Sequence, residues 1–179
     1  FRQTHETPIV LFTYLNPIYA YGFENFHKDA SAAGADGVLL LDLPPDEAKL
    51  NQEFAKGEGL KHITLIAPTS PDERIATLAA ESEGFIYALS RTGVTGADAA
   101  PSEGIGAVVA KIKKHTDTPV CVGFGISTAE QSAMVGSVSD GVVVGSAIVN
   151  VVAENTDCED VAAKVSAFTK PLIDAAKGL

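Results

Sequence analysis

The sequence predicts an α/β fold of the (β/α)8 barrel class, with six βα units present and the first two missing. Six short apolar runs alternate with segments of helical character along the 179 residues. The runs are apolar on both faces, which is typical of parallel strands covered by helices. An open doubly wound sheet and a barrel both satisfy this pattern. A closed barrel needs eight strands, and six would leave two exposed edges, so the count favours a barrel that lacks two units.

The predicted strands are rich in β-branched residues and are bounded by glycine, proline or polar residues. No linker or shift in composition separates them, so we expect one domain over residues 1–179. The strands are predicted at Pro8–Tyr14, Asp36–Leu43, Lys61–Ala67, Gly84–Ser90, Pro119–Gly123 and Gly141–Gly145.

Helices are predicted between the strands from amphipathic spacing and from start and stop signals. Ser70 with Glu73, and Ser127 with Glu130, have the spacing of a capping box. Asn16–Gly22 is rich in turn formers and is expected to be a loop. The helices are predicted over Phe23–Ala33, Asp46–Lys56, the residues from Ser70 to about Ser82, Ile105–His115, the residues after Ser127, and most of Ala147–Lys177.

Composition excludes several classes of partner. A formal net charge of −10 argues against binding to nucleic acid or to an anionic membrane. No apolar run reaches the roughly 18 residues of a membrane span, and the cytoplasm is the expected compartment. Cys121 and Cys158 are expected to remain free thiols. The chain begins FRQTHETP, without an initiator methionine, and is expected to be part of a longer protein.

Two glycine-ended strands predict a phosphate site. Pro119–Ser127 and Asp140–Val149 each pass from a β-branched run through glycine into a helix. Glycine lets backbone N–H groups approach a ligand, and a helix N-terminus favours an anion. In βα barrels a phosphate commonly binds in the loops after the last two strands. The nearby lysines of Lys111–Lys114 are interpreted as a solvated helix end.

Few acid–base groups follow the predicted strands, where such folds carry their active sites. Asp42 is the only carboxylate at a strand end, and it either acts chemically or ties neighbouring loops together. Tyr14, Tyr87 and Phe124 are interpreted as pocket residues. No histidine has metal-ligand spacing, and neither a metal nor a cofactor is expected. All four histidines are expected to be solvated at the surface: His5, His27, His62 and His115.

A long connection, Arg91–Gly104, follows the fourth predicted strand. It exceeds the usual length of a βα loop, and long loops in compact domains are often active-site lids. Gly93, Gly96 and Gly104 would give it hinge freedom. A surface insertion is the alternative.

Several motifs together resemble one family. They are PIVLFTYLNPIYAYG, DGVLLLDLPPDEA, YALSRTGVTGA, GFGIS and GSAIV, and they span nearly the whole chain. In this order and spacing they resemble the α subunit of tryptophan synthase. The resemblance implies a TIM barrel whose third to eighth strands are the six predicted here. It also implies retro-aldol cleavage of indole-3-glycerol phosphate, without a cofactor, in complex with a β subunit.

The resemblance also implies which residues bind the substrate. The β subunit would dock on the side of Asp42 and of the loop after Asn16, and Thr95 and Gly96 would belong to the loop that closes over substrate. The phosphate would be held by Gly125, Gly145 and Ser146, with Phe124 beside them. The indole-glycerol pocket would be lined by Phe12, Tyr14, Leu39, Leu65 and Tyr87.

One departure from the family concerns the catalytic groups. Its acid–base glutamate and its indole-facing aspartate belong to the first two units, so no catalytic residue is expected within these residues. Two alternatives to an α chain remain. One is a non-catalytic fragment that binds a phosphate ligand or docks on the β subunit. The other is a different barrel enzyme acting on a sugar or indole phosphate, against which LSRTGVTG argues.

Overall fold

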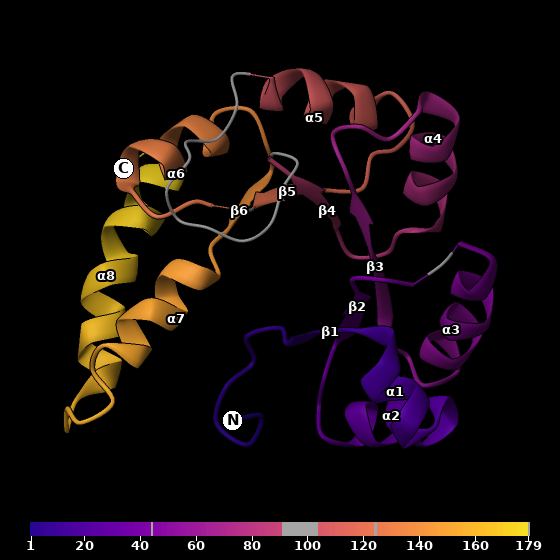
Figure 1. Ribbon diagram of the computed structural model, residues 1–179, viewed down its shortest axis with the longest axis horizontal. Coiled ribbons are helices and arrows are strands. Elements are labelled where there is room, and N and C mark those ends of the chain that lie inside the picture. The colour runs from indigo at the N-terminus through magenta and orange to yellow at the C-terminus, as the bar shows by residue number, and fades with distance from the viewer. Residues whose placement is uncertain (44, 91–103, 124, 179) are drawn as a thin grey trace.

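The computed structural model describes residues 1–43, 45–90, 104–123 and 125–178. Its centre is a six-stranded sheet in which the strands follow chain order and every neighbouring pair is parallel. The sheet curves into an open barrel with β1 and β6 at its ends (Figure 1). The six predicted strands are confirmed, each somewhat shorter than expected: β1 (Val10–Thr13), β2 (Gly37–Leu40), β3 (Lys61–Ile66), β4 (Ile86–Leu89), β5 (Val120–Gly123) and β6 (Gly141–Val143).

Helices follow each strand and lie along the outer side of the sheet (Figure 1). The predicted C-terminal helical region is confirmed as two helices separated by one break. The helices are α1 (Leu15–Tyr21), α2 (Phe23–Ala32), α3 (Pro45–Gly57), α4 (Asp72–Glu81), α5 (Ile105–Lys113), α6 (Ala129–Gly136), α7 (Ser146–Ala153) and α8 (Val161–Ala176).

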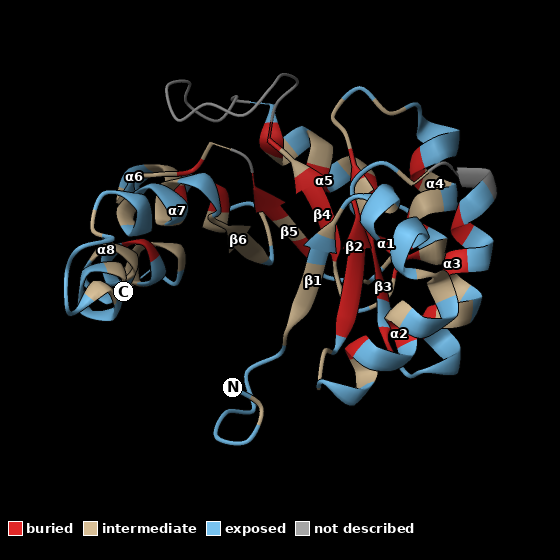
Figure 2. Cartoon of the chain, turned by 60° about the horizontal axis from the view of Figure 1, so that its bottom comes forward, coloured by how far each residue is buried: buried red, intermediate tan, exposed pale blue. Residues whose placement is uncertain are grey.

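The strands are buried on both faces, which explains their continuous apolar sequences. Successive side chains of a strand point to opposite faces, and β2 shows the result. Val38 and Leu40 pack outward against the helices, whereas Leu39 packs inward with Ile63 and Tyr87. Figure 2 shows buried residues concentrated on the central strands. The alternation fixes which side chains line the inside of the open barrel.

One predicted loop is a helix. Most of the stretch Asn16–Gly22, which was expected to be irregular, belongs to the helix α1 (Leu15–Tyr21). Pro17 is tolerated there because it lies in the first turn. The N–H of Leu15 donates to Asp42 Oδ1 at 2.7 Å, and Ile18 is buried. The helix is therefore stabilised by a carboxylate from the β2–α3 connection, a contact that local sequence does not reveal.

Neither predicted capping box forms as expected: the one at α4 is absent, and the one at α6 is displaced by one residue. The N-cap of α4 is Pro71, without a side-chain cap, and Ser70 lies in the preceding turn. The box of α6 is formed by Thr128 and Gln131, one residue later than expected. In each case the residue after the predicted serine is the N-cap: Pro71 follows Ser70, and Thr128 follows Ser127.

Two of the predicted solvated lysines take part in tertiary contacts. Lys111 donates to the Ser70 carbonyl at 3.1 Å, and Lys113 pairs with Asp140 at 2.6 Å. This pairing lowers the pKa of Asp140, chiefly through the Lys113 hydrogen bond. The lysine cluster therefore joins α5 to its neighbours. Both cysteines are free, as predicted.

The prediction of four solvated histidines is wrong for two of them. His27 on α2 is 0% exposed and His62 on β3 is 6% exposed. His27 is stacked on the rings of Phe23 and Phe54, with centroids 6.5 Å and 6.1 Å away. The helical periodicity of α2 places His27 on the inward face together with Ala30. Its position in the helix, rather than its polarity, therefore decides that it is buried.

Asn51 on α3 is a buried polar side chain without hydrogen-bond partners among the described residues. It is 0% exposed, and the atoms concerned are its Nδ2 and its Oδ1. Burial of an unpartnered amide costs about 1–3 kcal/mol. We expect Asn51→Leu to raise the free energy of unfolding by about 1–3 kcal/mol in urea denaturation. Asn150→Leu, on the exposed part of α7, is the matched control and should change it by less than about 0.5 kcal/mol. An equal or larger gain at Asn150 would contradict this account.

Within the described ranges, no helix is long and apolar enough to cross a membrane. The same part of the chain contains no group of three or more His, Cys, Asp or Glu side chains placed to hold a metal ion.

Candidate functional site

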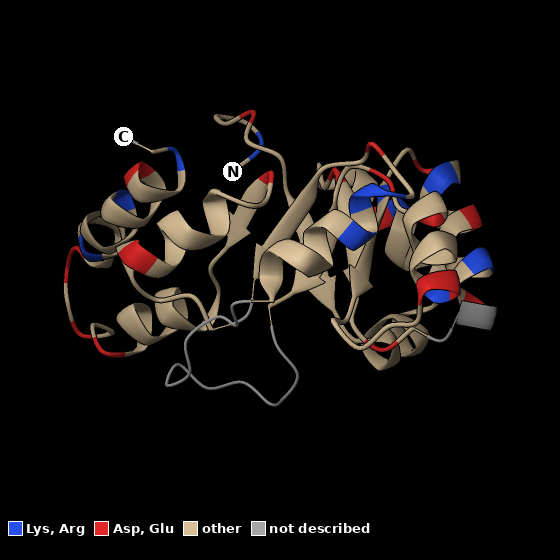
Figure 3. Cartoon of the chain, turned by 90° about the horizontal axis from the view of Figure 1, so that it is seen from above, with Lys and Arg blue, Asp and Glu red and all other residues tan. Residues whose placement is uncertain are grey.

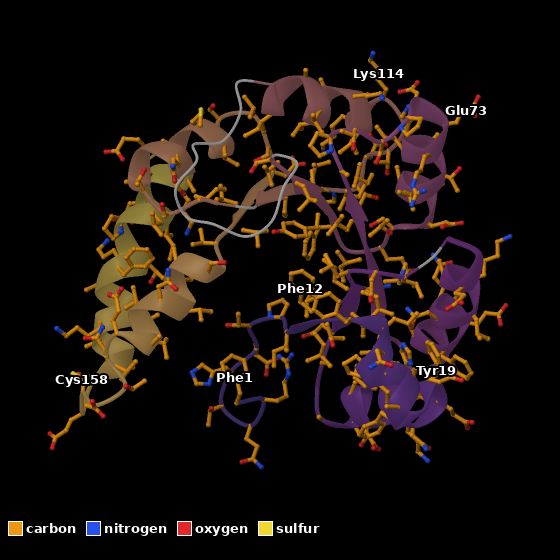
Figure 4. All side chains as sticks on the ribbon, in the orientation of Figure 1. Phe1, Phe12, Tyr19, Glu73, Lys114 and Cys158 are labelled. Carbon is orange, nitrogen blue, oxygen red and sulfur yellow. The ribbon has the colours of Figure 1, made fainter. Side chains whose placement is uncertain are left out.

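The inner face of the sheet carries an aromatic and apolar wall that contains four of the predicted pocket residues. In the sheet register Phe12 lies beside Leu39, and Leu65 lies beside Tyr87. The rings of Phe12 and Tyr87 meet edge to face, with centroids 6.0 Å apart and an interplanar angle of 78°. Figure 4 shows Phe12 on the inner side of the curved sheet. The wall is suited to a flat, apolar ring, because aromatic edges and faces pack against such rings.

Gly123 at the end of β5 makes room for this wall. A Cβ atom on Gly123 would lie 2.5 Å from Tyr87 Cε2 and 2.8 Å from Val143 Cβ. The ring of Tyr87 therefore lies directly over the Gly123 backbone. Sequence reasoning placed Gly123 at the end of a strand on the active face, but it did not count Gly123 among the residues that line the pocket. The position of Gly123 could have been predicted from strand alternation. Cys121 is the cross-strand neighbour of Tyr87, and Gly123, two residues later, lies on the same inner face of β5.

The predicted phosphate residues follow β5 and β6, two neighbouring strands. Gly125 has a φ of 80°, a conformation that favours glycine. Gly145 is the N-cap of α7, and Ser146 is the first residue of that helix. A Cβ atom on Gly145 would have no described atom within 4 Å. The N-terminus of α7 is therefore approachable from the carboxyl edge of the sheet.

Tyr14 and Asp42 lie at the same edge, toward the start of the chain. Tyr14 is the N-cap of α1 and is mostly exposed. Asp42 accepts the hydrogen bond from the N–H of Leu15, so its carboxylate ties the β2–α3 connection to α1. Of the two interpretations of Asp42, this geometry supports the structural one.

Charged groups are scarce on the inner face. Lys61 is the only charged residue in the six strands, and the Lys, Arg, Asp and Glu positions coloured in Figure 3 lie mainly on helices and loops. Burial raises the pKa of Tyr87 and of Cys121, so both stay protonated near neutral pH. Among the described residues within two positions of a strand's carboxyl end, Asp42 is the only carboxylate. This part of the site can bind a substrate, but it offers little general acid–base chemistry.

Three predicted site residues lie outside the described residues. They are Thr95 and Gly96 of the expected lid, and Phe124 beside the expected phosphate site. Their roles stay predictions.

Comparison with known proteins identifies the family. A family model described as tryptophan synthase alpha chain matches residues 1–177. The chain belongs to the tryptophan synthase alpha chain family. It is 45% identical over 176 residues to the tryptophan synthase alpha chain of Desulfosudis oleivorans, covering 98% of this chain and 66% of that relative. With the tryptophan synthase alpha chain of Desulfatibacillum aliphaticivorans the identity is 47% over 177 residues, covering 99% and 67%. The chain thus spans about two thirds of the length of these relatives.

Solved structures of tryptophan synthase share the fold. A mutant tryptophan synthase α-subunit from the hyperthermophile Pyrococcus furiosus superimposes with a TM-score of 0.82 at 36% identity, covering 100% of this chain and 70% of that one. A structure of tryptophan synthase from Mycobacterium tuberculosis gives 0.84 at 37% identity, covering 94% and 62%. The open, six-stranded arrangement therefore corresponds to part of a tryptophan synthase alpha chain.

Proposed function

We propose that these residues form the substrate-binding part of a tryptophan synthase alpha chain that cleaves indole-3-glycerol phosphate to indole and glyceraldehyde 3-phosphate. One observation carries the proposal. The aromatic wall of Phe12 and Tyr87 and the open helix start at Gly145 occupy the inner side and carboxyl edge of one sheet. A ligand with a flat apolar ring at one end and a phosphate at the other would fill both.

Each end of the substrate has its own set of residues in this proposal. The indole ring packs against the wall, and the phosphate receives hydrogen bonds from backbone N–H groups near Gly125, Gly145 and Ser146. An acidic chain can hold a phosphate in this way because the helix N-terminus supplies the positive end of a dipole. Thr95, Gly96 and Phe124 complete the proposed site. The indole wall is formed by Phe12, Tyr14, Leu39, Leu65 and Tyr87.

The reaction needs two proton transfers. One proton is delivered to the indole carbon that loses its bond to the glycerol side chain. The other leaves the adjacent glycerol hydroxyl, whose oxygen becomes the aldehyde oxygen. Such transfers call for positioned acid and base groups, and we place these on βα units that precede the present residues in the whole protein. In this proposal the 179 residues bind substrate and the preceding units supply the carboxylates.

Partner binding is proposed at the α1 side of the carboxyl edge. Tyr19 and Tyr21 are more than half exposed there, and Leu41 is 37% exposed. Tyrosines that combine an apolar ring with a polar tip are enriched at protein interfaces. This surface is where we expect the β subunit of tryptophan synthase to dock.

The phosphate assignment is tested by Gly145→Val. The new side chain would occupy the open space at the start of α7 and keep an anion away from its N–H groups. We expect the affinity for indole-3-glycerol phosphate, measured by titration calorimetry, to fall about tenfold or more, since hydrogen bonds to a charged group contribute about 1.5–3 kcal/mol each.

Two further measurements make this result specific. Gly57→Val is the matched control, because a Cβ atom there also meets no described atom within 4 Å and Gly57 ends α3, away from the site. Urea denaturation of both variants separates lost binding from lost folding. An unchanged affinity in a folded Gly145→Val variant would show that the phosphate binds elsewhere.

A further inference from the structure

A buried histidine on the outer side of the sheet has no part in the proposed reaction. His62 belongs to β3, is 6% exposed and lies beneath α3 and α4. It lines a cavity of about 360 Å³ together with Thr64, Arg74 and Glu81. The Oγ1 of Thr64 is buried there without a hydrogen-bond partner among the described residues.

Gln52 of α3 contacts both this histidine and the end of α4. Its Nε2 lies 3.3 Å from the carbonyl oxygen of Glu81 and 3.2 Å from Nδ1 of His62. A carbonyl oxygen only accepts hydrogen bonds, so the group facing it is the amide NH2 of Gln52. The same NH2 also faces Nδ1, which accepts from it when the ring is neutral and Nδ1 carries no proton. The contact fits neutral His62 and opposes the imidazolium, whose Nδ1 would carry a proton.

The surroundings of His62 also favour the neutral ring. Burial lowers the pKa of His62, partly opposed by a hydrogen bond with the Glu81 backbone and by the charge of Glu83. The Oε2 of Glu83 accepts from the backbone N–H of His62 at 3.4 Å rather than from the ring. The charged and titratable groups facing His62 are Glu81 and Glu83 from the α4 side, Arg74 across the cavity, and His27 from α2.

We propose that the contact of His62 with Gln52 and Glu81 is an acid-sensitive latch that holds α3 and α4 against β3. At neutral pH the Gln52 amide donates to the ring and to the end of α4, so one side chain joins three elements. A proton on Nδ1 makes the ring a donor that the Gln52 NH2 cannot accept from, so this contact is lost; the Glu81 carbonyl and Glu83 only partly compensate for the charge left in the interior. This property is independent of the proposed enzymatic function.

The sign of the pH dependence follows from the direction of the pKa shift. Because the pKa of His62 is lower in the folded state, the open state binds more protons as the pH falls below about 6.5. The stability that the latch contributes is fully present above that pH and is lost as the pH falls through the folded pKa. At pH 5 the open state is favoured by up to about 30-fold relative to pH 8. Both helices begin at the carboxyl edge of the sheet, so their opening would loosen the edge that carries the proposed site.

The experiment is hydrogen exchange of the chain at pH 5 and pH 8, corrected for the intrinsic exchange rates. We expect protection factors of α3 and α4 amides to fall by up to about 30-fold at pH 5, with a smaller change in α6 and α8. His62→Asn keeps an acceptor near Gln52 but cannot titrate. In this variant the protection factors of α3 and α4 should fall much less between pH 8 and pH 5. His5→Asn removes an exposed histidine, and this control should show the same fall in protection as the unmodified chain.

A second measurement keeps the proposal testable if His62→Asn does not fold. The imidazole of His62 is titrated by NMR in the unmodified chain and in Gln52→Glu, where a carboxylate replaces the donor. The midpoint should lie below about 6.5 in the unmodified chain and rise in Gln52→Glu. An ordinary midpoint in the unmodified chain, an unchanged midpoint in Gln52→Glu, or an equal loss of protection in His62→Asn would each overturn the latch.

Discussion

The 179-residue chain alone is expected to cleave indole-3-glycerol phosphate at a negligible rate, even with a tryptophan synthase β subunit present. Positioned acid and base groups contribute about 10²–10⁴-fold each, and we place both on βα units outside these residues. Asp42 is a poor substitute, since its carboxylate accepts the N–H of Leu15 and holds α1 in place. Binding of substrate without turnover is the expected result.

The measurement is indole release by the purified chain, with its mass confirmed, compared with the same chain fused to the two preceding βα units of a relative. The fusion should close the barrel and restore activity together. It should also reduce self-association, because the outer edges of β1 and β6 have no partner strand among the described residues. The matched control is a fusion whose added carboxylates are replaced by amides, which should close the barrel without activity. Rapid indole release by the unfused chain would show that a group within it acts as acid or base, and would contradict the proposed mechanism.

Gly123→Val is expected to give the largest loss of stability of any single change considered. The new Cβ atom would lie 2.6 Å from the Tyr87 hydroxyl oxygen and 2.8 Å from Val143 Cβ. Both distances are too short, so these neighbours or the backbone of β5 must move. The valine methyl groups add further volume. Overpacking of this kind costs about 1–3 kcal/mol, and occasionally more. Because Tyr87 contacts Phe12, its displacement should also weaken substrate binding.

A double-mutant cycle in urea denaturation isolates this contact. Tyr87→Leu removes the ring atoms nearest to Gly123, so Gly123→Ala should cost less in that background than in the unmodified chain. The expected coupling is about 0.5–3 kcal/mol, the range for residues in direct contact. Gly57→Ala, where the new Cβ meets no described atom within 4 Å, is the control and should show no coupling with Tyr87→Leu. Strict additivity of Gly123→Ala and Tyr87→Leu would contradict the packing described.

Sequence reasoning succeeded where the determinant is local or periodic. The aliphatic run VLL of β2 is apolar at every position because the strand is buried on both faces. The resemblance to the family, rather than the alternation, assigned Phe12, Leu39, Leu65 and Tyr87 to one pocket, and the structure brings these four residues together on the inner face of the sheet. The family motifs were equally readable, and the family match over residues 1–177 agrees with them.

It failed where a distant residue decides a local outcome. The helix α1 depends on Asp42, which is 27 residues away from Leu15. The two buried histidines were expected at the surface because an imidazole is polar, yet His27 stacks on aromatic rings and His62 is held by a glutamine and a carbonyl group. These partners come together only when α2 and α3 pack on the sheet.

The sequence by itself determined the order of strands and helices, the parallel sheet and the family, because each depends on periodicity and on motifs that are continuous in the chain. The tertiary structure decided which residues meet. It placed Gly123 beneath Tyr87, turned Asp42 into a support for α1 and left the start of α7 open at Gly145. It also joined His62 to Gln52 and Glu81 in the interior. The physical reason is that hydrogen bonding, close packing and burial depend on distances between segments, and those distances exist only after the strands have curved into a sheet and the helices have packed against it.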